Sequence, residues 1–284
     1  MTESFARCYG RPSAMEAFYV REPEARETPV VVEVPHAGLA IPPGCLAPLT
    51  APVRSLGRDA DLLVDELYAD APSVGATLIV ARVSRYVVDL NRGASDVDPE
   101  VVEGTTTSQR FNHGLIWRLT SDGDRVLARA LTRTELDERL ERYYRPYHDA
   151  VAAALERKRA RFGFAVLLAA HSMPSVGRTT AGSPGVARAD VIPGTRGRTT
   201  AAARFIDAVD AHAKAGGFTV RHDDPYAGGF STQHYGRPRD GLHAVQVELS
   251  RRLYLDESTL RPRADTFDAV RGWCKKLVET MGAV

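Results

Sequence analysis

The sequence predicts an α/β protein, a three-layer α/β/α sandwich around a mixed, mainly parallel sheet. Apolar, β-branched segments alternate with amphipathic ones along the 284 residues, the pattern of successive strand–helix–strand units. The first expected strand, residues 30–34, is almost wholly apolar, which is typical of a strand covered on both faces. Because no internal repeat or linker composition interrupts the chain, we expect one domain over residues 1–284.

The N-terminal half is expected to add one helix and two strands. A loop rich in Pro and Gly occupies residues 41–44, and a helix is expected over residues 59–69. Residues 76–83 and 86–90 are apolar and β-branched, which favours two successive strands.

The clearest helix is expected over residues 134–161. Apolar and aromatic side chains recur there at helical spacing, namely at Leu136, Leu140, Tyr143, Tyr144, Tyr147 and Val151. Thr134 begins a plausible N-capping signal that continues to Asp137. Pro146 should kink the helix or divide it in two.

The C-terminal half continues the alternation of strands and helices. A central strand is expected at residues 164–170, followed by a long segment without regular structure at 172–198, whose length suggests a functional loop. The remaining expected elements are a helix at 199–215, a strand at 218–222, a Gly-rich loop to Gly241, a strand ending at Glu248 and a helix at 266–281.

Composition narrows the class of protein. Lys and Arg number 37 against 36 Asp and Glu, so the basic excess that a nucleic-acid partner usually requires is missing. No apolar run approaches membrane-spanning length, and the N-terminus lacks the pattern of a signal peptide. Cys8, Cys45 and Cys274 fit free thiols of a reducing compartment, so we expect a cytoplasmic protein without a membrane or nucleic-acid partner.

Three residues at the ends of apolar runs are unusual for that place. His36 ends the run that begins at Thr28, His171 ends the run that begins at Phe164, and Glu248 ends the run that begins at His243. Sites in open α/β sheets are built at the carboxyl ends of the strands. Imidazoles arriving there can bind a divalent metal, with Glu248 as a general base beside it, although a capping His or a Glu248 ion pair with Arg251 or Arg252 remains an alternative.

A metal site needs a third protein ligand, and the segment Arg58-Asp-Ala-Asp61 offers two. Asp61 is our candidate and Asp59 its competitor, although an acidic residue at a helix N-terminus is also favoured by capping and by the helix dipole.

Polar residues elsewhere suit the binding of a substrate carboxylate. Arg92 can bind a carboxylate through two hydrogen bonds, and Asn91 can add a donor, although such a pair also suits a turn. Arg85 is a candidate for polarising a scissile carbonyl. Tyr226, in a flexible aromatic loop that suits a lid, and Ser172, next to His171, are candidates for substrate contact.

These motifs, in this order, resemble the N-formylglutamate amidohydrolase (deformylase) family. The segments that carry the resemblance fall across roughly residues 30–260: Pro35–Gly38, the acidic segment around Asp61, Ser84–Arg92, Gly114–Arg118, Tyr143–His148, His171–Pro174, Pro225–Gly229 and Gln246–Leu249. Single motifs are weak, but their joint order is specific.

The resemblance implies a fold similar to that of the zinc carboxypeptidases and aspartoacylases and a metal-dependent amide hydrolase. It implies hydrolysis of N-formyl-L-glutamate to formate and L-glutamate, late in histidine degradation, with one Zn²⁺ per chain or another divalent metal. His36, Asp61 and His171 would bind the metal, Glu248 would act as base and then acid, and Arg92 with Asn91 would hold one carboxylate while a second arginine holds the other. The zinc carboxypeptidases and aspartoacylases take two ligands from a His-x-x-Glu motif, whereas the fourth residue counted from His36 is Leu39. The identity of the acidic ligand, Asp61 or Asp59, is therefore left open.

Two other functions remain open at this stage. A related amidohydrolase could act on another N-acyl amino acid or small peptide, and a metal-free carboxylate-binding protein could share the fold. The related amidohydrolase would differ from an N-formylglutamate amidohydrolase in the acyl groups that it accepts, and the binding protein would differ from it in holding no metal.

Overall fold

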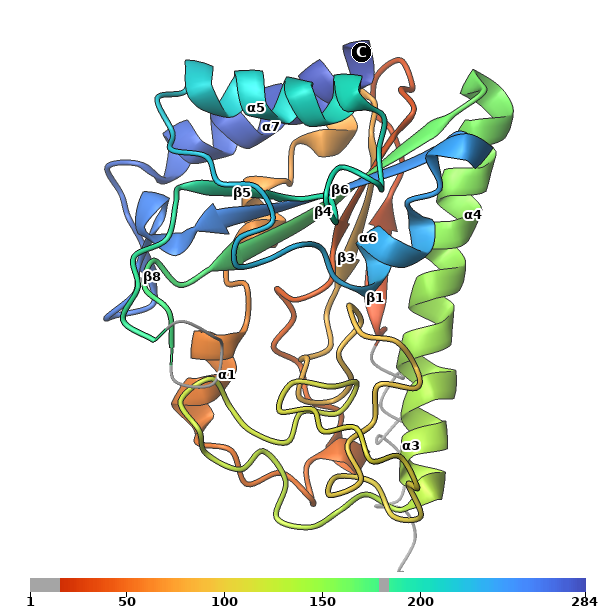
Figure 1. Ribbon diagram of the computed structural model, residues 1–284, viewed down its shortest axis with the longest axis vertical. Helices are drawn as coiled ribbons and strands as arrows, with labels where there is room; N and C mark the ends of the chain where they lie inside the picture. The colour runs from red at the N-terminus through yellow and green to blue at the C-terminus, as the bar shows by residue number, and fades with distance from the viewer. Residues whose placement is uncertain (1–15, 179–183) are drawn as a thin grey trace, which may run out of the picture.

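A computed structural model describes residues 16–178 and 184–284 (Figure 1). Its centre is a six-stranded sheet of order β1-β3-β2-β4-β6-β5. The four inner strands run parallel, and both edge strands run antiparallel to their neighbours. The strands of this sheet are β1 Phe18–Arg21, β2 Val30–Val34, β3 Thr77–Ala81, β4 Ala165–Met173, β5 Val191–Gly194 and β6 Leu242–Ser250.

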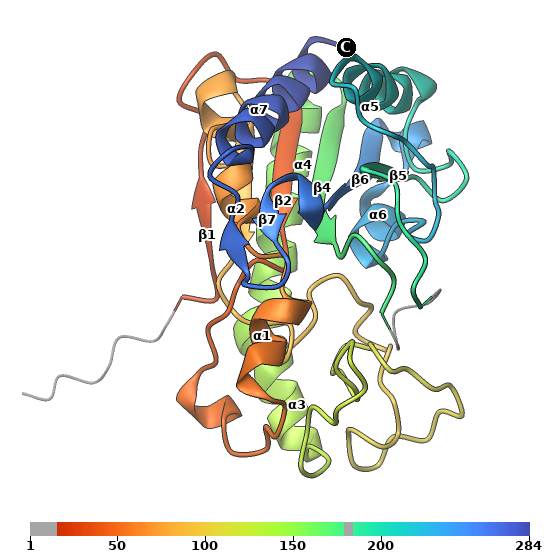
Figure 2. The same cartoon turned by 90° about the vertical axis from the view of Figure 1, so that its left-hand side faces the viewer.

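Helices cover both faces of the sheet, which confirms the three-layer prediction (Figures 1 and 2). The α-helices are α1 Val53–Asp59, α2 Val64–Leu67, α3 Arg133–Arg139, α4 Arg145–Phe162, α5 Ala203–Ala215, α6 Phe230–Tyr235 and α7 Phe267–Ala283. One apolar core lies between the sheet and α4, and a second lies between the sheet and the helices α2, α5 and α7.

Shorter elements complete the chain. They are the 3-10 turns η1 Pro43–Cys45, η2 Ala71–Val74, η4 Pro238–Asp240 and η5 Arg251–Leu253, and the antiparallel pair β7 Leu255–Asp256 and β8 Arg261–Pro262. Within the described ranges, none of the helices combines the length and the apolar character needed to cross a bilayer. Cys45 and Cys274 are buried free thiols, whereas Cys8 lies outside the described residues.

The central strands are buried on both faces, as their composition predicts. In β2, Val31 packs into the core on the α4 side, and Val30, Val32 and Val34 pack into the opposite core. β4 is longer than predicted, because it continues through His171 to Met173. The strand predicted to end at Glu248, the helix predicted at 199–215 and the final helix are confirmed with small shifts of their ends.

The long helix runs without a break through the proline that was expected to disturb it. A π-helical stretch, η3 Leu140–Tyr144, joins α3 to α4, and Pro146 follows it as the second residue of α4. The residue without an N–H therefore lies where the hydrogen-bonding pattern changes from π-helical to α-helical. The helix begins earlier than predicted, because Thr132 and Glu135 form a reciprocal capping box ahead of Thr134.

Three predicted elements are wrong. The helix expected over 59–69 is divided, because the Asp61 N–H donates to the His36 carbonyl at 3.0 Å and Leu63 adopts a φ of 64°. Residues 86–90 form no strand but turns, closed by bonds such as Val87 N–H to Ser84 O at 2.8 Å. Residues 218–222 make only an isolated bridge between Val220 and Val191.

The elements that were not predicted include the helices α1 and α6, the short pair β7 and β8, and the edge strands β1 and β5 of the sheet. β5 lies inside the segment 172–198 that was expected to lack regular structure, and residues 179–183 of that segment lie outside the described residues. Both strands are four residues long and lie at the edges of the sheet, so their periodicity is too short to stand out.

Candidate active site

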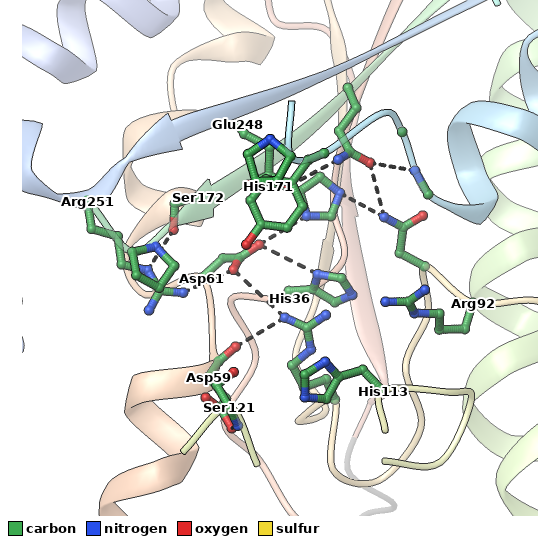
Figure 3. Close-up of a pocket in the computed structure, with 18 of the residues that line it drawn as sticks. His36, Asp59, Asp61, Arg92, His113, Ser121, His171, Ser172, Glu248 and Arg251 are labelled. Carbon is green, nitrogen blue, oxygen red and sulfur yellow. Dashed lines mark hydrogen bonds and ion pairs between the residues drawn. The ribbon is translucent and has the colours of Figure 1, made fainter. Parts of the chain in front are cut away.

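The carboxyl ends of β2, β4 and β6 open onto a cavity of about 380 Å³ (Figure 3). His36 lies two residues beyond β2, and His171 lies in β4 directly opposite Glu248 of β6 in the strand register. The three side chains line the cavity and are almost fully buried, with 3%, 2% and 6% exposure. The parallel strands thus bring together at one edge the three residues that the sequence analysis singled out.

Asp61 completes a cluster with the two histidines. Its Oδ2 lies 3.0 Å from His171 Nδ1 and 3.5 Å from His36 Nδ1. The ligand atoms of the three residues all lie within 4.8 Å of one another. Burial alone would raise the pKa of Asp61, but hydrogen bonds from His171 and His36 hold this pKa well below its ordinary value. Two imidazole nitrogens and a carboxylate oxygen form a donor set that suits zinc and similar divalent metals.

Asp59, the competing acid, lies outside this cluster. It ends α1, and its Oδ2 accepts hydrogen bonds from Tyr86 Oη at 2.5 Å and from the Ser121 N–H at 3.0 Å. Its carboxylate is therefore turned toward the neighbouring loop, and Asp61 is the acid that faces both histidines.

Asp89 holds His36 from the side of the ring opposite to Asp61. Its Oδ1 lies 2.8 Å from His36 Nε2, while its Oδ2 accepts bonds from Arg85 and, at 2.8 Å, from Trp117 Nε1. Burial would raise the pKa of Asp89, but Arg85 and His36 hold it well below its ordinary value. A carboxylate on the far nitrogen of an imidazole fixes the ring and leaves its other nitrogen, here Nδ1 beside Asp61, for a metal.

Glu248 lies in a different environment. Its Oε1 accepts one hydrogen bond, from Gln246 Nε2 at 3.0 Å, and burial raises its pKa to about 7. The alternative of an ion pair with Arg251 or Arg252 is wrong for the described part of the chain. Arg251 instead donates to Asp61 Oδ1 at 3.3 Å, and Arg252 pairs with Asp190.

Arg92 is the cationic side chain of the cavity wall that is most open to a ligand. Within residues 16–178 and 184–284, its guanidinium makes no hydrogen bond or ion pair, whereas Arg58 pairs with Asp122 and Arg85 with Asp89. The neighbouring Asn91 amide is already engaged at both ends. Its Oδ1 accepts from the Ser231 N–H at 2.9 Å, and its Nδ2 lies 3.3 Å from Gln246 Oε1.

The other predicted contact residues also line the cavity. The Arg85 guanidinium lies over the Trp117 ring, 4.4 Å from its centroid, with Nη1 at 4.0 Å from Asp61 Oδ1. Ser172 Oγ accepts from Arg251 Nε at 3.2 Å, and the Tyr226 hydroxyl accepts from Arg188 at 2.8 Å.

Sequence reasoning missed the contributions of Asp89, Trp117, Arg251 and the Gln246 amide. Asp89 carried a usable signal, because a carboxylate inside the apolar run Val87-Val-Asp-Leu90 is costly unless it is paired. Arg251 had been considered only as a partner of Glu248. Its bonds to Asp61 and to the Arg58 and Ala60 carbonyls depend on contacts distant in sequence.

Comparisons with known proteins agree with the resemblance seen in the motifs. The model of the N-formylglutamate amidohydrolase family matches residues 28–255. An N-formylglutamate deformylase of Pseudomonas aeruginosa is 35% identical over 259 residues, which cover 89% of this chain and 92% of that protein. Another, from Pseudomonas putida, is 32% identical over 233 residues, which cover 81% of this chain and 83% of that protein.

Solved structures give the same result. The crystal structure of an N-formylglutamate amidohydrolase from Ralstonia eutropha JMP134 has a TM-score of 0.85 at 29% identity, covering 95% of this chain and 98% of that one. A gene product of Agrobacterium tumefaciens has a TM-score of 0.68 at 25% identity, covering 94% of each chain. The sequence matches extend over most of both partners, and so the chain belongs to the N-formylglutamate amidohydrolase family.

Proposed function

We propose that this protein hydrolyses N-formyl-L-glutamate to formate and L-glutamate, with one zinc ion held by His36, Asp61 and His171. The observation that supports this most is the convergence of three ligand atoms within 4.8 Å beside a buried carboxylate whose pKa is raised to about 7. The names of the relatives point to the same substrate.

The residues present fit a bound metal. His36 is fixed by Asp89, so Nδ1 of its ring faces Asp61, and the low pKa of Asp61 keeps a negative charge at the site. When bound, the metal would supply Lewis acidity at the formyl carbonyl and activate water. Arg251 and the Asp61 backbone bond to His36 hold the carboxylate in place.

Glu248 acts as the proton carrier in this proposal. As a carboxylate it takes a proton from the attacking water, and as a carboxylic acid it gives that proton to the departing amine of glutamate. Both roles need a pKa near the working pH, which burial provides here. Arg85, beside Asp61, assists by stabilising negative charge that develops on the carbonyl oxygen.

Substrate binding is assigned to the cavity wall. Arg92 binds one substrate carboxylate through two parallel hydrogen bonds, and Asn91 keeps the wall beside it in place. Tyr226 and Ser172, which also line the cavity, are assigned contacts with the acyl group and the amide of the substrate.

The test is formate release by the purified protein after metal analysis. We expect stoichiometric zinc, hydrolysis of N-formyl-L-glutamate, loss of activity on chelation and its return with added zinc. N-acetyl- and N-succinyl-glutamate, and N-formyl amino acids with uncharged side chains, form the control panel. A zinc-loaded protein that releases no formate contradicts the substrate assignment, and one that prefers a larger acyl group reassigns it.

A further inference from the structure

We infer that Gln246 is a positioning residue of this site, whose side-chain amide aims the Glu248 carboxylate and ties it to the cavity wall formed by residues 225–229. The inference rests on the proposed role of Glu248 as the base. It extends that proposal to a residue that, within the described residues, makes no hydrogen bond to any of the three proposed metal ligands.

Gln246 uses both ends of its amide in the interior of the protein. It is 3% exposed and lies two residues before Glu248, so both side chains project from the same face of β6. Its Nε2 donates to Glu248 Oε1 at 3.0 Å, and its Oε1 accepts from the Gly229 N–H at 2.9 Å and from Asn91 Nδ2 at 3.3 Å.

These partners leave a single orientation for the amide. The Gly229 N–H can only donate, so it requires the carbonyl oxygen of Gln246, and the amide nitrogen must then face Glu248. A flipped amide would set two donors against each other at Gly229 and two oxygens against each other at Glu248. The orientation of the donor to Glu248 is therefore fixed by a backbone group of another segment.

The Glu248 carboxylate is held by this amide and by little else. Within the described residues, no other hydrogen bond or ion pair to it is found, and Oε2 remains available to face the cavity. A neutral donor orients one oxygen without the strong ion pair that an arginine would make, so the carboxylate can still accept a proton.

The same amide fixes the cavity wall. Residues 225–229 all line the cavity, and the wall is packed so closely that a Cβ at Gly229 would lie 2.4 Å from the Asn91 side chain. On the adjacent strand, a Cβ at Gly194 would lie 2.7 Å from the Gly228 nitrogen. Gln246 thus connects the base to the segment that carries Tyr226.

Two substitutions separate the two contacts. Gln246→Met keeps the approximate volume and removes both contacts, whereas Gln246→Glu keeps an acceptor for the Gly229 N–H and places a second carboxyl group against Glu248. Val245→Ala is the matched control, because Val245 packs on the opposite face of β6 in the core formed with α5 and α7.

Kinetics with the zinc-loaded enzyme test the contact to the base. We expect both Gln246 variants to lose about 100-fold in kcat, with zinc content retained and KM changed less than about fivefold. In a Glu248→Gln background, Gln246→Met should change kcat by less than about threefold, because the group that it positions is gone. A kcat within about threefold of wild type, an equal loss in the Glu248→Gln background, or an equal loss in Val245→Ala would overturn the inference.

Hydrogen exchange tests the contact to the wall without any substrate. The Gly229 amide should exchange faster in Gln246→Met and stay protected in Gln246→Glu and Val245→Ala. Unchanged protection of the Gly229 amide in Gln246→Met would contradict the proposed link between Gln246 and the cavity wall. Formate release by the wild type tests the proposed function alone. If another N-acyl amino acid proves to be the substrate, the same ratios between variants are measured on it.

Discussion

The two sides of the cavity bury carboxylates in opposite ways. On the Asp61 side, the carboxylate is surrounded by the imidazole rings of His171 and His36 and by the guanidinium of Arg251. On the side of Glu248, the partner is a neutral amide. Both carboxylates are almost completely buried, at 3% and 6% exposure, yet the pKa of Asp61 falls well below its ordinary value and that of Glu248 rises to about 7.

The difference teaches that burial alone does not decide what a carboxylate does. Burial raises the pKa of both groups, and the number and charge of the hydrogen-bond donors decide whether that increase is reversed. A carboxylate that stays ionised suits metal binding, and one that titrates near neutral pH suits proton transfer. The experiments below test this difference between the Asp61 side and the Glu248 side of the cavity.

The largest expected effect concerns the Glu248 side of the cavity. Glu248→Gln keeps the size and a hydrogen-bonding group but removes the base, so we expect kcat to fall by about 10³- to 10⁴-fold with zinc retained. Formate release and metal analysis on the same preparation provide the measurement. Turnover close to wild type, together with inactivity of Asp59→Asn at full zinc content, would move the catalytic role away from Glu248.

On the Asp61 side, a matched pair of substitutions distinguishes Asp61 from Asp59 as the metal ligand. Asp61→Asn should weaken zinc binding by more than about 100-fold, because it removes a charged ligand, and His171→Ala should do the same. Asp59→Asn should keep the metal, because its carboxylate bonds to Tyr86 and Ser121. Metal competition with a chromophoric chelator measures each affinity, and normal zinc content in Asp61→Asn would exclude Asp61 as a ligand.

The sequence was most informative where a single costly residue ended a buried strand. His36, His171 and Glu248 could be found because imidazole and carboxylate groups are rare in such runs and because parallel strands end at one edge. The sheet and its two covering layers followed from the same alternation of patterns. The edge strands β1 and β5 did not, since four residues give too short a period.

The irregular parts of the site were beyond pattern reasoning. Apart from Asp89, residues 86–90 are apolar because they are buried, and burial in a turn cannot be distinguished from burial in a strand by composition. The short α2 begins after Leu63, whose positive φ is atypical of a leucine. The partners of Asp61 and Gln246 come from segments far apart in the chain, so only the folded structure reveals them.

A smaller effect is expected at Arg92, which lies between the two sides. Arg92→Ala should lower kcat/KM by about 100-fold, because it removes the guanidinium that pairs with a substrate carboxylate. Arg92→Lys should recover only part of this loss, since an ammonium cannot make the two parallel bonds. Arg145→Ala, at an exposed arginine paired with Glu141 on the long helix, serves as the control. Equal kinetics for Arg92→Ala and Arg145→Ala would exclude Arg92 from substrate binding.

The smallest expected effect is the pH dependence of kcat/KM that titration of Glu248 produces. Glu248 must be ionised to take a proton, so activity is present above its pKa of about 7 and is lost as the pH falls through it. A divalent metal nearby favours the ionised form, which places the acid limb of kcat/KM at or below this value. Below the limb, kcat/KM should fall about tenfold per pH unit, and Glu248→Gln should flatten this dependence in its residual activity. A limb that persists in Glu248→Gln and follows zinc loss would instead assign it to release of the metal from its ligands.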